Sequence, residues 1–125
     1  MKTSMSDIII YTLALTLFQI WLLPMLLNLK NSAWLFSSRD DAVETSIMYE
    51  RASRASANLQ ASLPAFLALC LLAMQLQLDV SGAAMIWLAL RVVYIPLYLF
   101  GINMLRSISW VGSVVCMIDM ALTLV

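Results

Sequence analysis

The sequence predicts an all-α integral membrane protein in which four helices cross the bilayer as one bundle. Three observations support this fold class. Hydrophobic residues make up 63% of the chain and charged residues only 11%, whereas a soluble domain carries roughly 25% charged residues. Long stretches contain no charge at all, and most connections between them are short. With 125 residues the chain has the length of one domain, residues 1–125.

The apolar runs define the spans. The first holds 22 consecutive uncharged residues, and a bilayer core needs about 20. The third run is interrupted only by Arg91 and the fourth only by Asp119. Because short links join the last three runs, neighbouring helices are expected to pack antiparallel. The four predicted spans cover residues 8–29, 53–77, 82–101 and 105–124.

The charges narrow the possible functions and suggest an orientation. Seven basic and seven acidic residues cancel, which argues against a nucleic-acid partner. The chain has no histidine, so Ser-His-Asp and Cys-His catalysis and most zinc sites are excluded and no metal is expected. Basic residues gather around the connection 30–50 and at Arg106. Since positive residues collect on the cytoplasmic side, both termini are expected on the other side. The small size and the lack of a targeting tail suggest a bacterial inner membrane.

Polar side chains form one stripe on each of the second and third predicted helices. In each stripe the residues are spaced i, i+3 and i+7, which places them on one helix face. Such a group of arginines, amide, phenols and hydroxyl suits a small anion that bears carboxylates. Alternatively, the arginines near the helix ends are ordinary flanks that extend to lipid headgroups. The residues are Arg51, Arg54 and Asn58 on the second helix, Arg91, Tyr94 and Tyr98 on the third, and Arg106 and Ser107 at the start of the fourth.

Arg91 stands apart because it lies near the middle of its span. A lone arginine at that depth costs roughly 2.5–3.5 kcal/mol on insertion scales, so it needs a partner. Asp119 on the antiparallel fourth helix lies within about 6 Å of the same depth, at roughly 1.5 Å per residue. Two interpretations remain open: an Arg91–Asp119 pair that holds the bundle together, or a role for Arg91 in ligand binding.

Two segments in this order resemble a known family. Residues 50–73 (ERASRASANLQASLPAFLALCLLA), with the two arginines, the asparagine and the Leu-Pro-x-Phe step, resemble the second helix of the MAPEG family. These are the membrane-associated proteins in eicosanoid and glutathione metabolism. Residues 91–101 (RVVYIPLYLFG), followed by Leu-Arg-Ser at 105–107, resemble that family's third helix and the entry to its fourth.

The resemblance implies a homotrimer that binds glutathione, as a co-substrate, between protomers near the cytoplasmic side. It implies transferase or peroxidase chemistry on lipophilic small molecules, with membrane lipids around the protein. A guanidinium and a hydroxyl near the thiol would hold it as the reactive thiolate. By this resemblance Arg106 and Ser107 would be catalytic, and Arg51, Arg54, Asn58, Tyr94 and Tyr98 would contact the tripeptide; Arg91 joins them as a binding candidate from the same stripe.

Two departures from the family pattern keep other functions open. The family's glutamate before the helix proline is Ala61 here, and the basic residue that some catalytic members carry is Ala57. One alternative is therefore a non-catalytic protein of the same fold that binds another anion or a lipid. A more remote alternative is a small multidrug-type transporter. That mechanism needs a buried carboxylate in the first span, which offers only the amides Gln19 and Asn28.

Overall fold

The computed structural model describes residues 4–27 and 47–125, and within these ranges the chain is helical and contains no strand. Four helices are long and apolar enough to cross a membrane, as predicted. The predicted connection 30–50 lies mostly outside the described residues. The elements are α1 (Met5–Leu17), the π-helical turn η1 (Phe18–Leu22), α2 (Leu23–Leu27), α4 (Ile47–Leu76), α5 (Ser81–Leu99) and α6 (Asn103–Leu124).

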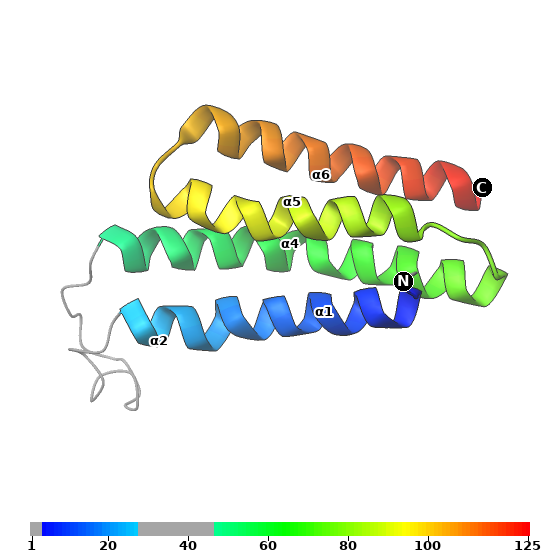
Figure 1. Cartoon of the computed structure of the whole chain (residues 1–125), viewed down its shortest axis with the longest axis horizontal. Coiled ribbons are helices and arrows are strands. Elements are labelled where there is room, and N and C mark those ends of the chain that lie inside the picture. Colours follow the sequence, from blue (N-terminus) through cyan, green and yellow to red (C-terminus); the bar gives the residue numbers. More distant parts are fainter. Residues whose placement is uncertain (1–3, 28–46) are drawn as a thin grey trace.

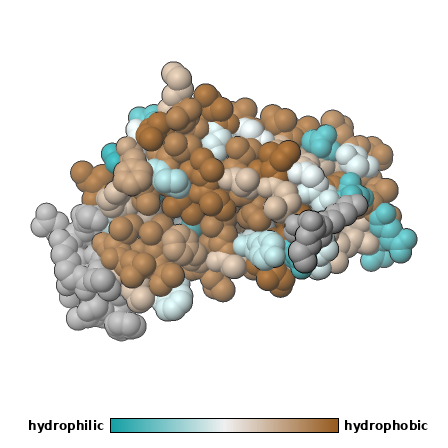
Figure 2. All heavy atoms as spheres, in the orientation of Figure 1, coloured by the Kyte–Doolittle hydropathy of each residue, from teal (hydrophilic) through white to brown (hydrophobic). Residues whose placement is uncertain are grey.

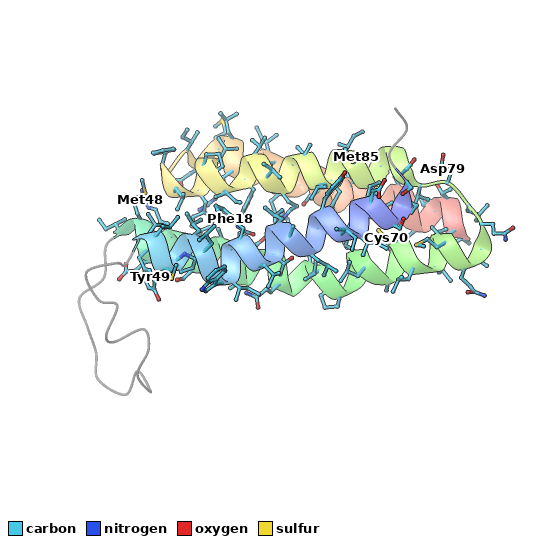
Figure 3. All side chains as sticks on the ribbon, turned by 60° about the horizontal axis from the view of Figure 1, so that its bottom comes forward. Phe18, Met48, Tyr49, Cys70, Asp79 and Met85 are labelled. Atoms are coloured by element: carbon cyan, nitrogen blue, oxygen red, sulfur yellow. The ribbon has the colours of Figure 1, made fainter. Side chains whose placement is uncertain are left out.

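Helices that follow one another in the chain run antiparallel (Figure 1). The first helical rod, made of α1, η1 and α2, packs against α4 and α5, and α4 also contacts α6. The start of α1 and the end of α6 lie at the same end of the bundle (Figure 1). In Figure 3, Met48 and Tyr49 lie at one end and Asp79 at the other. We call the end where α4 begins and α5 passes into α6 the basic end, because it carries Arg54 and Arg106.

Apolar side chains dominate the outside of the bundle. Large hydrophobic residues are exposed on every helix. Figure 2 shows hydrophobic residues over most of the visible face, with small hydrophilic groups toward its two ends. Such a surface is favourable only in contact with lipid or with another apolar surface. The chain is therefore an integral membrane protein.

The first rod begins and changes its helical geometry for identifiable reasons. Ser4 and Asp7 form a capping box, in which each side chain accepts a hydrogen bond from the other residue's backbone N–H. The π-helical turn comes directly before Pro24, and the Leu23 N–H donates to the carbonyl of Phe18. Because proline lacks an N–H, the regular α-helical ladder cannot continue there. One turn of the helix takes the wider π-helical form, and the helix continues instead of ending.

The second membrane helix, α4, is longer than predicted. It begins at Ile47, whereas the span was expected from residue 53. Hydropathy detects only the apolar part of a helix, but the polar first turns through Arg54 are held by packing, since Ala52 and Ala55 are buried. The helix ends at Leu76; the next residue, Gln77, has φ of 58°, and the Leu78 N–H bonds back to the carbonyl of Ala73.

Helices α5 and α6 approach each other closely. The Ser109 hydroxyl donates to the carbonyl of Leu90 at 2.9 Å. A methyl group added to Gly112 would come within 3.0 Å of the Leu90 Cδ1. Small residues on α6 thus let the two backbones pack tightly, as membrane helices often do. On the other side of α5, the ring of Trp87 stacks on Phe66 of α4 at 3.7 Å between centroids.

Candidate functional site

An open pocket of about 460 Å³ lies at the basic end, between α4, α5 and α6. Six of the eight predicted site residues line it. From α4 come a guanidinium and an amide, from α5 two phenols, and from α6 a second guanidinium and a hydroxyl. These residues are Arg54, Asn58, Tyr94, Tyr98, Arg106 and Ser107.

Tyr98 joins the two arginines of the pocket. The Arg106 guanidinium lies over the Tyr98 ring, 4.7 Å from its centroid, and the Arg54 guanidinium lies 6.0 Å from the same centroid. Both distances are within the range of cation–π attraction. The Tyr94 ring meets Tyr98 edge to face at 5.6 Å. A ring of α5 thus holds together side chains from α4 and α6 that would otherwise repel each other.

Arg106 and Ser107 owe their position to the start of α6. The helix begins at Asn103, and the Arg106 N–H bonds to the carbonyl of Ile102. Both side chains therefore lie within the first turns, where the free N–H groups give the helix end a partial positive charge. This partial charge has the same sign as the two guanidinium groups, so it adds to the positive potential at this side of the pocket.

Sequence reasoning missed two lining residues, Trp110 and Val111. Relative to Ser107, these residues lie at i+3 and i+4, so they share its helix face. That spacing was the signal that could have found them. They give the pocket an apolar wall: Trp110 is 42% exposed and Val111 51%.

Arg51 does not line the pocket; it caps α5. Its Nη1 donates to the carbonyl of Leu99 at 3.0 Å. The three preceding carbonyls of α5 accept from Phe100, Gly101 and Ile102, so Arg51 completes the set of four that a helix end leaves free. Gly101 adopts φ of +70°, and a methyl group there would come within 3.3 Å of the Arg51 guanidinium.

Arg91 also lies outside the lining, behind it. It is 2% exposed, and its Nη2 donates to the Asn58 Oδ1 at 2.9 Å. Its guanidinium lies 4.5 Å from the centroid of the Tyr94 ring. Asp119 is exposed on α6, and within the described residues no ion pair joins it to Arg91. Of the two interpretations of Arg91, the Arg91–Asp119 pair is therefore not the one that the structure forms.

The described residues contain no cluster of three or more cysteine, aspartate or glutamate side chains that could hold a metal ion. The two cysteines are free thiols on different helices. Cys70 lies on α4 well away from Met48 and Tyr49, which mark the basic end (Figure 3). The chemistry of the pocket therefore depends on its arginines, phenols, amide and hydroxyl.

The fold and the pocket define a class: a four-helix integral membrane protein with a cationic pocket at one end of the bundle. Comparison with family models identifies it further. The model of the MAPEG family matches residues 8–125, nearly the whole chain, and the protein belongs to the MAPEG family. Neither a search of curated proteins nor a search of solved structures found a match to this chain. Members of this family are generally oligomeric membrane proteins.

Proposed function

We propose that this protein is a membrane glutathione transferase-like enzyme that binds glutathione in the cationic pocket and activates its thiol. The observation that carries the proposal is the convergence of Arg54, Asn58, Tyr98, Arg106 and Ser107 on one pocket. Guanidinium groups bind carboxylates through paired, charge-assisted hydrogen bonds. Glutathione carries two carboxylates and an ionisable thiol, and the pocket presents two arginines and several neutral donors to these groups.

The proposed chemistry requires the thiol to ionise. A free thiol has a pKa of about 8.5 and is mostly protonated at neutral pH. The Arg106 guanidinium and the Ser107 hydroxyl favour the thiolate, which lowers the thiol pKa. The thiolate sulfur then attacks an electrophilic carbon; the new C–S bond forms as the leaving group departs with its electron pair, and the thiol proton passes to solvent. The apolar wall of Trp110 and Val111 receives the lipophilic electrophile.

We further propose a homotrimer in a bacterial inner membrane, with the basic end on the cytoplasmic side and the termini on the other. The arginines at that end and the oligomeric character of the family support this arrangement. The pocket is open at one side, so a neighbouring protomer has access to it. Native mass spectrometry of the detergent-solubilised protein tests the trimer.

A specific observation also favours a second function, a non-catalytic MAPEG protein that binds another anion or a lipid. Ala61 stands where the family carries a glutamate, and it is absent from the pocket lining. No carboxylate among the described residues replaces it there. The transporter alternative has less support, because Asp7, the one carboxylate of the described part of the first rod, is held in the capping box of α1.

The deciding experiment measures glutathione binding and thiol ionisation together. Calorimetry gives the affinity, and the ultraviolet difference spectrum of the thiolate gives its pKa in the protein. We expect saturable binding. We also expect the thiolate absorbance of bound glutathione to rise with pH at a midpoint below about 8.5, the pKa of the free thiol. In Arg106→Ala the rise moves to higher pH, and turnover of an aryl halide at pH 7 falls about 10- to 100-fold, since one unit of pKa changes the thiolate fraction tenfold.

The matched control is Asp119→Asn, which changes an exposed charge on the same helix, about 20 Å from Arg106 at 1.5 Å per residue. It should leave binding and turnover unchanged. If glutathione does not bind at millimolar concentration, the enzyme proposal is wrong and the non-catalytic alternative stands. If glutathione binds but turnover in Arg106→Ala equals that of the parent, thiol activation by Arg106 is excluded.

A further inference from the structure

The contact between Arg91 and Asn58 decides what the pocket offers a ligand. A guanidinium has only donors, so the atom of Asn58 that faces Arg91 is the oxygen, at 2.9 Å from Nη2. The amide nitrogen of Asn58 is then the group left to face the pocket that this residue lines. Arg91 therefore fixes Asn58 as a donor toward the ligand, although Arg91 is itself outside the lining.

The rest of the polar lining also offers donors. Arg54 and Arg106 donate only, the indole donates, and the hydroxyls of the two tyrosines and Ser107 both donate and accept. Of the four acidic residues in the described part of the chain, none lines the pocket. Among the described residues of one protomer, the lining thus combines fixed positive charge with hydrogen-bond donors and includes no carboxylate.

The buried charge of Arg91 strengthens the preference of the pocket for anionic groups. Among the described residues its Nε and Nη1 have no hydrogen-bond partner, and Arg91 is only 2% exposed. A buried cation without an acidic partner acts over a longer distance than an exposed one, because little water screens it. An anion in the pocket, beyond Asn58 and Tyr94, is attracted by this charge, and a cation there is repelled.

We infer that the described lining recognises the anionic groups of its ligand and makes no ionic contact with an ammonium group, and that Arg91 is a positioning residue that sets this preference through Asn58. The inference rests on the proposed function, glutathione binding in this pocket, and names the ligand class more narrowly: a thiol with two carboxylates and no free amino group. Glutathione itself would bind despite its γ-glutamyl ammonium, which the pocket leaves unpaired.

Two ligands that differ only in the ammonium test this inference. Calorimetry of the complete protein in detergent compares glutathione with glutaryl-cysteinylglycine, the same peptide without its amino group. We expect the desamino peptide to bind about three- to tenfold more tightly, the effect of removing a cation a few ångströms from a guanidinium in a partly screened site. If glutathione binds as tightly or more tightly, the inference is overturned while the proposed function stands. If neither peptide binds, both are overturned.

Two substitutions test the role of Arg91. Asn58→Asp keeps the shape but supplies a carboxylate between Arg91 and the pocket, so the preference for the desamino peptide should fall to none or reverse. Arg91→Met frees the Asn58 amide to present its oxygen, and the ratio of the two dissociation constants should fall toward one. Arg91→Lys, which keeps a charged donor, should restore the ratio. A purely structural role would weaken both peptides equally and leave the ratio unchanged, which would overturn the assignment of Arg91.

Discussion

Replacing Arg51 by methionine isolates the cap of α5. The change removes the hydrogen bond from Nη1 to the Leu99 carbonyl at 3.0 Å and keeps most of the side-chain volume. A hydrogen bond to a charged group contributes about 1.5–3 kcal/mol, and a cation at a helix C-terminus adds about 0.3–1 kcal/mol. Within a membrane protein such contacts average nearer 0.6 kcal/mol. We therefore expect Arg51→Met to lower the free energy of unfolding by about 1–3 kcal/mol.

The assay is unfolding in mixed micelles, followed by circular dichroism. Arg54→Met is the matched control: it removes an exposed arginine one turn along the same helix, whose only described contact is the 6.0 Å approach to Tyr98, and should cost less than about 1 kcal/mol. Equal stability losses in the two variants would refute the cap. Gly101→Ala provides a second test, because alanine at φ of +70° costs about 1–2 kcal/mol and its methyl group displaces Arg51. The two effects overlap, so the double variant should lose less than their sum.

Three further predictions concern packing and substrate choice. Trp87→Phe should cost less than about 1.5 kcal/mol, because it removes a buried N–H that has no partner within the described part of the chain, whereas Trp87→Ala should cost about 3–5 kcal/mol; unfolding in micelles separates the two. Gly112→Val should destabilise the bundle by about 1–3 kcal/mol, since a methyl group alone already approaches Leu90 within 3.0 Å; an unchanged transition would contradict the close approach of α5 and α6. Trp110→Ala should raise the KM for bulky aromatic electrophiles about tenfold and change glutathione binding much less, because truncating an aromatic side chain that packs on a ligand costs more than about 1 kcal/mol; steady-state kinetics with a small and a large electrophile test it.

The helices were predictable because their signals are local. Charge-free runs gave the number of spans, and the i, i+3, i+7 spacing grouped Arg54 with Asn58 and Tyr94 with Tyr98, which the pocket indeed brings together. The extension of α4 back to Ile47 was not predicted, since hydropathy indicates which residues lie in the bilayer core and not where the helix begins. A helix can continue into water wherever its turns find something to pack against.

Arg51 and Arg91 show the limit of this reasoning. Helix periodicity placed Arg51 near the face of Arg54, but three residues along a helix differ by about 60° in direction, and that difference turns Arg51 toward α5 and Arg54 toward the pocket. Depth in the membrane made Asp119 a reasonable partner for Arg91. Depth does not report which way a helix is rotated, and α6 presents Asp119 to the outside while α4 presents Asn58 to Arg91.

Arg51 and Arg91 lie outside the pocket, but they help to fix the positions of Arg54 and Arg106 inside it. Arg51 holds the end of α5, and the turn at Gly101 that follows leads within five residues to Arg106. Arg91 holds Asn58, one helical turn from Arg54. Arg106 thus follows a turn that the half-buried Arg51 stabilises, and Arg54 lies one helical turn from the Asn58 side chain that the buried Arg91 holds. Because rigid placement before binding lowers the conformational entropy lost on binding, substitutions at Arg51 should weaken an anion in the pocket even though that side chain never touches it. A substitution at position 51 that lowers stability without lowering affinity would show that the turn and the pocket are independent.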